Sequence, residues 1–193
     1  MSNIEPLTAC FTGRRPKDLY GYEHDAYIPL VENLKHCVRL LHEQYGVRRF
    51  ISGGAQGVDQ LAFWAVNRLK CEGFPLSNIV YVPFKGQDSI WRDTGLFSKK
   101  EYALMLKMAD DVVYLKDAIS KNNKGAIVTA LHERNHSMVD KSDIVVGVFP
   151  DLSWRDSATK GGTAECLRYA HSQHKTIFQL NYTANPMQYW WAQ

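Results

Sequence analysis

Two glycine-rich turns with basic residues beside them are the part of the sequence best suited to bind an anion. SGGAQG occupies residues 52–57 and KGGT occupies residues 160–163. Glycine permits positive φ angles and close approach of a phosphate to the backbone, and the N-terminus of a following helix attracts negative charge. Arg14 and Arg15, in the segment TGRRP, add two cations at a third turn. These turns predict a phosphate-bearing ligand, although tight strand-to-helix turns alone could also explain the glycines.

Several other polar or aromatic residues could contact such a ligand. Asp59 falls in the first turn of a predicted helix, where it could bind a ligand hydroxyl or simply favour the helix dipole. Trp91 could stack on a base and Arg92 could lie near a phosphate, but packing explains the tryptophan equally well. The residues expected to bind the ligand and its phosphate are Gly13, Arg14, Arg15, Ser52, Gly53, Gly54, Gly57, Asp59, Trp91, Arg92, Gly161, Gly162 and Thr163.

The segment HERNH, residues 132–136, matches the HExxH pattern of zinc peptidases. Its two histidines are one helical turn apart, but a zinc peptidase needs a third protein ligand supplied by a different architecture. We therefore expect a helix with incidental histidines, no metal site and no cofactor.

Short apolar runs alternate with longer segments of helical period, which predicts an α/β fold: an open, Rossmann-like parallel sheet with helices on both faces. The expected helices include about 99–109 and 126–140, and one that begins after KGGT and ends near His174. The expected strands are Leu7 to Thr12, Arg49 to Ser52, Ile79 to Pro83, Asp111 to Leu115, Asp143 to Phe149 and Thr176 to Leu180.

In such a sheet, ligands bind beyond the carboxyl ends of the strands. The candidate turns follow the first, second, third and fifth expected strands, so we expect them to line one cleft. The glycine spacing is not GxGxxG, and no acidic residue ends the second strand to bind an adenosine ribose. A standard NAD dehydrogenase is therefore disfavoured.

Composition places further limits on the protein. A chain of 193 residues, 45% of them hydrophobic, suits one domain spanning residues 1–193. Its formal charge of +3 gives no general preference for nucleic acid or membrane. The four cysteines form no CxxC pair, and we expect buried, reduced thiols in a cytoplasmic protein without a leader or membrane span. The final YWWAQ should dock on the domain or form a dimer contact.

The motifs together resemble the YpsA-like family of the SLOG superfamily. The matching segments are FTGRRP, FISGGAQGVDQLA, PFKGQDSIWRD, RNHSMVDKSDIVVGVF and KGGTAECLRYA, in that order. The resemblance implies a Rossmann-like domain that binds a nucleotide or a nucleotide-derived molecule, such as one derived from NAD or ADP-ribose, and acts as a sensor or sequestering protein.

A related branch, the LOG phosphoribohydrolases, implies an alternative. LHERNHSMVDKSD is similar to a LOG helix, and by that resemblance Arg134 and Glu165 would be catalytic and Thr163 would match the threonine of Thr-x-Glu. Glu165 could stabilise an oxocarbenium ion at C1′ or orient a water, while Arg134 pairs with a phosphate or carboxylate. LOG enzymes carry a compact PGGxGT, whereas a longer insert here separates Pro150 from Gly161. Resemblance to LOG proteins also implies a homodimer.

DprA-type proteins provide a second alternative, because their glycine turn resembles SGGAQGVD. They bind single-stranded DNA, so the same turn could hold a DNA phosphate. The sequence shows no basic groove and only a small net charge, which disfavours nucleic acid as a partner.

Overall fold

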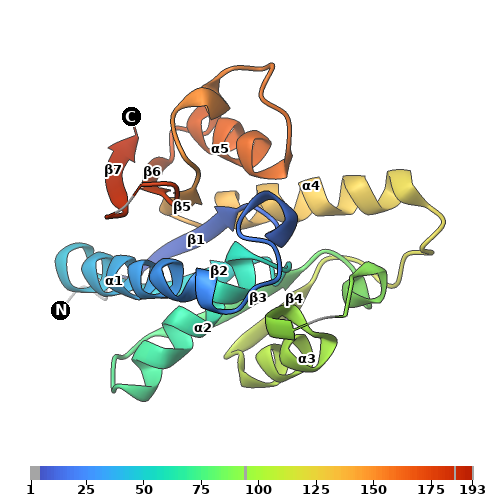
Figure 1. Ribbon diagram of the computed structural model, residues 1–193, viewed down its shortest axis with the longest axis horizontal. Helices are drawn as coiled ribbons and strands as arrows, with labels where there is room; N and C mark the ends of the chain where they lie inside the picture. Colours follow the sequence, from blue (N-terminus) through green and yellow to red (C-terminus); the bar gives the residue numbers. More distant parts are fainter. Residues whose placement is uncertain (1–4, 94, 185, 193) are drawn as a thin grey trace.

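The computed structural model describes residues 5–93, 95–184 and 186–192. These residues form one seven-stranded sheet with the strand order β4-β3-β2-β1-β5-β6-β7 (Figure 1). The strands are β1 (Leu7–Gly13), β2 (Val47–Ser52), β3 (Ser77–Val82), β4 (Asp111–Tyr114), β5 (Ile144–Val148), β6 (Thr176–Asn181) and β7 (Gln188–Ala192). The first six are parallel, which confirms the predicted Rossmann-like α/β architecture.

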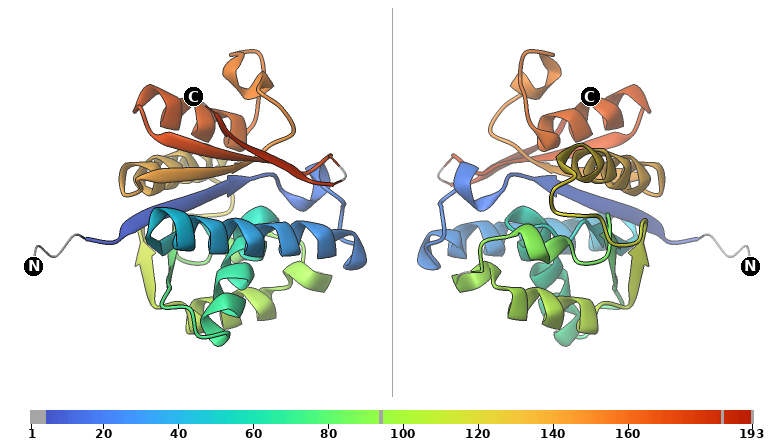
Figure 2. Two further views of the ribbon diagram at one scale, coloured as in Figure 1. Left: turned by 90° about the vertical axis from the view of Figure 1, so that its left-hand side faces the viewer. Right: turned by 90° about the vertical axis from the view of Figure 1, so that its right-hand side faces the viewer.

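Helices cover both faces of the sheet (Figure 2). They are α1 (Ile28–Tyr45), α2 (Val58–Cys71), α3 (Lys99–Met108), α4 (Lys124–Asp140) and α5 (Gly162–Ser172), with short 3-10 turns between some of them. The first three lie on one side of the sheet, and α4 and α5 lie on the other. Among the helices in the described ranges, none is long and apolar enough to cross a membrane.

Side-chain alternation along the strands builds two cores. In β1, Ala9 and Phe11 face the core under α1 and α2, whereas Cys10 faces the core under α4 and α5. In β5, Val146 faces the core under α1 and α2, and Val145 faces the core under α4 and α5. Because successive strand residues point to opposite faces, a strand buried on both faces needs apolar residues throughout, and β5 is buried along its whole length.

The strand order reverses between β1 and β5. The chain adds β2, β3 and β4 successively on one side of β1, and then α4 crosses the sheet so that β5 pairs with the other side of β1. A reversal of this kind leaves a crevice at the carboxyl ends of the two central strands, and ligands of open α/β sheets bind there. The turn after β2 lies one strand away from this point.

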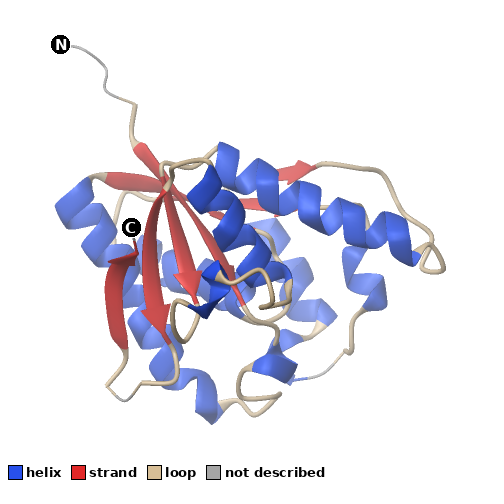
Figure 3. Ribbon diagram, turned by 90° about the horizontal axis from the view of Figure 1, so that it is seen from above, coloured by secondary structure: helices blue, strands red, loops and turns tan. Residues whose placement is uncertain are grey.

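Six strands were expected from the sequence, and the described residues contain a seventh, β7, formed by the C-terminal segment that was expected to dock on the domain or form a dimer contact. β7 pairs antiparallel with β6 at the edge of the sheet (Figure 3), so YWWAQ docks on the fold as a strand in its described part, up to Ala192. The Trp191 ring lies 4.8 Å from the Phe178 ring and 5.0 Å from the Tyr45 ring, between centroids. This segment has no alternating apolar pattern, because aromatic residues occupy both faces of the short strand.

The cysteine prediction was wrong at one position. Cys10, Cys37 and Cys166 are buried free thiols, whereas Cys71 is exposed at the C-terminal end of α2. Cys71 lies two residues after the buried Leu69, which is about 200° around the helix, so it points away from the apolar stripe that faces the core.

Candidate functional site

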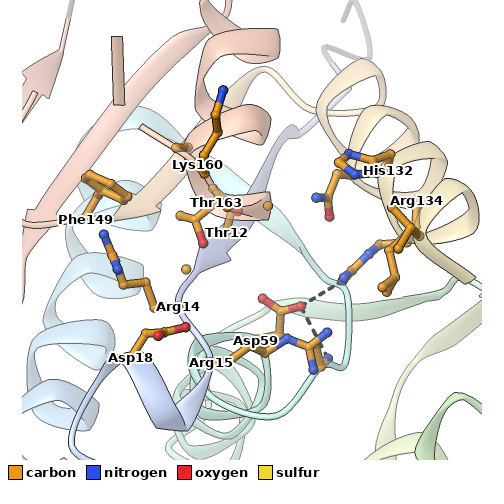
Figure 4. A pocket seen from close by; sticks show the side chains of 18 of the residues that line it. Thr12, Arg14, Arg15, Asp18, Asp59, His132, Arg134, Phe149, Lys160 and Thr163 are labelled. Atoms are coloured by element: carbon orange, nitrogen blue, oxygen red, sulfur yellow. Dashed lines mark hydrogen bonds and ion pairs between the residues drawn. The ribbon is translucent and has the colours of Figure 1, made fainter. Parts of the chain in front are cut away.

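A cleft of about 500 Å³ opens at the switch point between β1 and β5 (Figure 4). Its walls are the turn after β1, the start of α2, one side of α4, the end of β5 and the turn that begins α5. This volume lies within the range of small-molecule sites, which is roughly 300–1,000 Å³. The predicted residues that line it are Gly13, Arg14, Arg15, Asp59, Arg134, Gly161, Gly162 and Thr163, together with Lys160.

The turn after β1 supplies two arginines. The guanidinium carbon of Arg14 lies 4.7 Å from the centre of the Phe149 ring, at the end of β5, and both side chains line the cleft. The Nε of Arg14 is buried and has no hydrogen-bond acceptor among the described residues. Gly13 allows α2 to pack here, because a Cβ at this position would collide with the side chain of Val58.

Arg15 lies deeper in the site. Burial lowers the pKa of its guanidinium, nearby Asp59 opposes that shift, and nearby Arg134 adds to it. Two cations thus share the neighbourhood of a single buried carboxylate in the described cleft wall. An anionic ligand would relieve the repulsion between them.

Arg134 and Asp59 form a buried ion pair across the cleft floor (Figure 4). Nη1 of Arg134 donates to Oδ2 of Asp59 over 2.8 Å, and the same oxygen accepts from the backbone N–H of Ala55 over 3.3 Å. Arg134 is only 5% exposed, because it projects from the side of α4 that also buries Ala130 and Met138. Its Nε has no acceptor within the described ranges.

The turn before α5 offers backbone donors. Gly161 has φ 115° and ψ 150°, and no described side chain caps the first turn of the helix. The first N–H groups of a helix lack intrahelical acceptors, so Gly162 and Thr163 present donors at a positive dipole end. Lys160 points away from the cleft centre (Figure 4) and donates from Nζ to the carbonyl oxygen of Ser157 over 3.0 Å.

Glu165 pairs with a histidine from the neighbouring helix. Its Oε2 lies 3.0 Å from Nδ1 of His132, and each side chain is 40% exposed. His132 lines the cleft, whereas Glu165 is not among its lining residues. His136, the second histidine of HERNH, instead stacks on Tyr169 with ring centroids 3.8 Å apart. In the described part of the chain, no three metal-binding side chains of the His, Cys, Asp or Glu type come together.

The other predicted site residues do not line the cleft. Trp91 packs on Tyr102 with ring centroids 4.9 Å apart, and the guanidinium of Arg92 lies 5.3 Å from the Tyr22 ring centre. The turn after β2 is buried beside the cleft. Its residues Ser52, Gly53, Gly54 and Gly57 are all inaccessible to solvent or nearly so.

The cleft also contains residues that sequence reasoning did not assign to the ligand. Thr12, Lys17, Asp18, Ala55, Val128, Leu131, His132, Asn135, Phe149 and Ala164 complete its lining. A signal existed for Asn135 and His132, because both lie in HERNH with Arg134 and fall within one helical turn of it. Phe149 could have been noted as the last residue of an expected strand, whereas Asp18 carried no recognisable pattern.

Fold and cleft together define a class: an α/β protein of Rossmann-like architecture with an arginine-rich cleft at its topological switch point. Comparison with protein families agrees, since the family model YpsA, described as the YspA SLOG family, matches residues 9–185. The chain belongs to this family, and its membership suggests a nucleotide-related function.

A curated relative is found in Bacillus subtilis strain 168. It is named "uncharacterized SPbeta prophage-derived protein YoqJ" and is 35% identical over 127 residues, which cover 63% of this chain and 68% of the relative. Its name states no ligand or activity, so the function must be inferred from the site.

Proposed function

We propose that the protein binds a nucleotide or a nucleotide-derived molecule in the cleft at the switch point, as a sensor or sequestering protein. The observation that carries this proposal is the charge of the cleft wall. Arg14, Arg15 and Arg134 all line the cleft, and the only buried carboxylate among the described lining residues is Asp59.

Arg14 and Arg15 are half-buried and Arg134 is buried, and positive charge that is withdrawn from water is costly unless an anion compensates it. A phosphate between the arginines and the first turn of α5 would accept hydrogen bonds from guanidinium groups on one side and from backbone N–H groups on the other. Guanidinium groups match phosphate geometry well, and the helix N-terminus adds a favourable dipole.

The rest of a nucleotide also finds suitable surroundings. The guanidinium of Arg14 lies over the ring of the buried Phe149 and is the flat group available to a base at this wall, and Leu131 and Val128 supply apolar surface from α4. Flat aromatic and guanidinium surfaces are the usual stacking partners of bases. A base and a phosphate would thus contact different walls of one cleft.

Binding can be tested by calorimetry with AMP, ADP, ADP-ribose and NAD, together with native mass spectrometry of the freshly purified protein. We expect one of these ligands to bind, and Arg15→Ala to weaken it about tenfold or more. Arg48→Ala is the matched control, since Arg48 is exposed near the start of β2, at the opposite end of the strand. No binding across the panel and no co-purified nucleotide would contradict the proposal.

The His132–Glu165 pair supports a second candidate, an N-glycoside hydrolase. A carboxylate beside a histidine at the cleft can orient a water that attacks C1′ of a ribosyl group. The water oxygen then bonds to C1′ while the bond from C1′ to the base nitrogen breaks, and the base leaves with a proton.

Release of free base from nucleoside monophosphates separates the two candidates. If the protein is a hydrolase, Glu165→Gln should stop release while binding persists. If no base is released and Glu165→Gln changes affinity only, the protein is a binder. A single-stranded oligonucleotide that binds more tightly than any nucleotide, with steep salt dependence, would instead favour the DNA-binding alternative.

A homodimer also belongs to the proposal, through the resemblance to LOG proteins. Sedimentation of the purified protein should give twice the chain mass of 22.1 kDa. If the protein is a monomer at every concentration, the homodimer is excluded, and the proposal of ligand binding is unaffected.

A further inference from the structure

We infer that Gly53 is a positioning residue that seats the guanidinium of Arg134, so that the glycine turn after β2 holds an arginine rather than a phosphate. The turn has the composition of a phosphate-binding loop, but an internal cation already occupies the space beside its first glycine. The anion of the ligand is then bound by the facing turn of α5 and by the free edge of Arg134.

The space next to Gly53 is filled by the ion pair. A Cβ built on Gly53 would lie 0.8 Å from Nη1 of Arg134, 2.1 Å from its Cζ and 2.6 Å from Oδ2 of Asp59. No side chain can occupy this position while Arg134 and Asp59 remain paired. The glycine therefore provides room for the guanidinium.

Backbone conformation does not explain the glycine at this position. Gly54 and Gly57 have φ angles of 66° and 99°, which favour glycine, but Gly53 does not lie in that region. A Cβ at Gly54 would also meet the buried side chains of Met105, Val80 and Tyr102. Within this turn, Gly53 is thus the glycine whose role depends on Arg134.

Buried amides keep the turn from moving away. The Gln87 side chain donates to the carbonyl oxygen of Gly53 over 3.4 Å, and the Gln60 side chain donates to that of Gly54 over 3.2 Å. Gln56 donates to the carbonyl oxygen of Phe97 over 2.7 Å, which ties the turn to the segment before α3. A side chain added at Gly53 would therefore displace the long, flexible arginine rather than the backbone.

The seat also determines which edge of Arg134 faces the ligand. Nη1 is used by Asp59, whereas Nε has no acceptor in the described part of the chain although Arg134 is only 5% exposed. A phosphate in the cleft, which Arg134 lines, would approach the guanidinium from the edge that Asp59 leaves free. This step rests on the proposed function; the seating of Arg134 by Gly53 does not.

A double-mutant cycle on the free energy of unfolding tests, without any ligand, whether Gly53 makes room for the guanidinium of Arg134. Gly53→Ala should lower the urea midpoint of the wild-type protein, because it breaks the Arg134–Asp59 pair. In an Asp59→Ala/Arg134→Ala background, the same substitution should have little effect, since the atoms it would strike are gone. An equal fall in both backgrounds would overturn the inference.

A spectroscopic measurement covers the case in which the double variant does not fold. In the NMR spectrum of the wild-type protein, the Arg134 side-chain N–H signals should be shifted and slow to exchange, and Gly53→Ala should abolish this signature. Gly125→Ala is the matched control, because a Cβ at Gly125 meets only one atom, at 3.9 Å. Persistence of the Arg134 signals in a folded Gly53→Ala protein would also overturn the inference.

A binding experiment tests the role of Arg134 toward the ligand, and it uses the nucleotide that calorimetry identifies as the tightest binder. Gly53→Ala should weaken its affinity by about tenfold or more, as loss of a charged hydrogen bond would, and Gly125→Ala should leave it unchanged. If the cycle shows coupling but no nucleotide binds the wild-type protein, the proposed function fails and the seat stands. If nucleotide binds normally to folded Gly53→Ala, the assignment of Arg134 to the ligand is wrong.

Discussion

At the scale of single residues, the cleft contains a charged side chain that other residues hold in place, Arg134. Asp59 fixes one edge of Arg134, and the carbonyl groups of the turn below are held by glutamine side chains. Groups oriented in advance lose little conformational freedom on binding, which favours affinity. The proposed anion would therefore be bound at a defined position rather than by general attraction of negative charge.

Removing one partner of the buried pair should be costly. Arg134→Met would leave the Asp59 carboxylate buried and uncompensated, and we expect a loss of about 3–5 kcal/mol in the free energy of unfolding. Asp59→Asn/Arg134→Met removes both charges and should recover most of this loss. Urea denaturation of the three proteins provides the measurement, and equal stability of the two variants would show that the pair is not effectively buried.

The sequence predicts which residues line the cleft better than it predicts which residues they pair with. Arg14, Arg15 and Gly161 line the cleft as expected, because basic and glycine residues directly after strands of a parallel sheet gather at one edge. The pairing of Arg134 with Asp59, 75 positions apart, left no local pattern. Trp91 had an ambiguous role in the sequence, and the structure packs it on Tyr102.

At the scale of elements, the beginning of α5 provides a matched pair of glycines. Gly161 has a backbone conformation available almost only to glycine, whereas Gly162 is the first residue of the helix. Gly161→Ala should cost about 1–3 kcal/mol of stability through backbone strain alone, because a Cβ there meets no described atom within 4 Å. Gly162→Ala should be neutral or slightly stabilising. Thermal unfolding distinguishes them, and equal melting temperatures would contradict the strained turn.

β7 should contribute to stability through its aromatic face. Trp191 packs on Phe178 and Tyr45, and its half-buried ring covers the end of the core under α1. We expect Trp191→Ala to lower the free energy of unfolding by about 2–3 kcal/mol, somewhat less than for a fully buried ring. Gln188→Ala, at an exposed position of the same strand, should change it little. A small effect of Trp191→Ala would mean that β7 is only loosely attached.

Most helices and strands could be predicted from the periodicity of the hydrophobic residues. The exception is β7, and it has a physical cause. The parallel strands contain short apolar runs separated by helices, and such runs are visible without any alignment. Burial is complete along β5, whereas the edge strand β4 has no buried residue. β7 is an antiparallel edge strand with polar and aromatic residues on both faces, so its membership of the sheet depends on pairing with β6. Pairing between strands is a tertiary property that a local pattern does not contain.

At the scale of the whole molecule, buried acidic protons should make the fold sensitive to alkali. Burial raises the pKa of Tyr27 from 10.0 to about 12 and that of Cys166 from 9.0 to about 11, and burial also raises the pKa values of Cys10, Cys37 and Tyr102. The unfolded chain therefore loses these protons at lower pH than the folded chain. Stability is fully present below about pH 9 and falls as the pH rises toward the folded-state values.

Urea unfolding at pH 7 to 11 measures this decline. Tyr27 alone should account for about 1 kcal/mol between pH 9 and 11. Tyr27→Phe loses the hydrogen bond to the carbonyl oxygen of Gly21, so it should be less stable at pH 7, but its stability should fall less steeply with pH. An identical slope in the two proteins would exclude Tyr27 as a contributor.

The close contact between Gly53 and the Arg134–Asp59 pair has an evolutionary consequence. Gly53 lies in the turn after β2, Asp59 lies in α2 and Arg134 lies in α4. A substitution at any one of these positions would disturb the contacts of the other two. Among homologous chains they should therefore covary: wherever position 134 carries a short side chain, position 53 is free to accept alanine or serine, and position 59 need not be acidic. Glycine at position 53 would then occur in those homologues that also carry arginine at position 134.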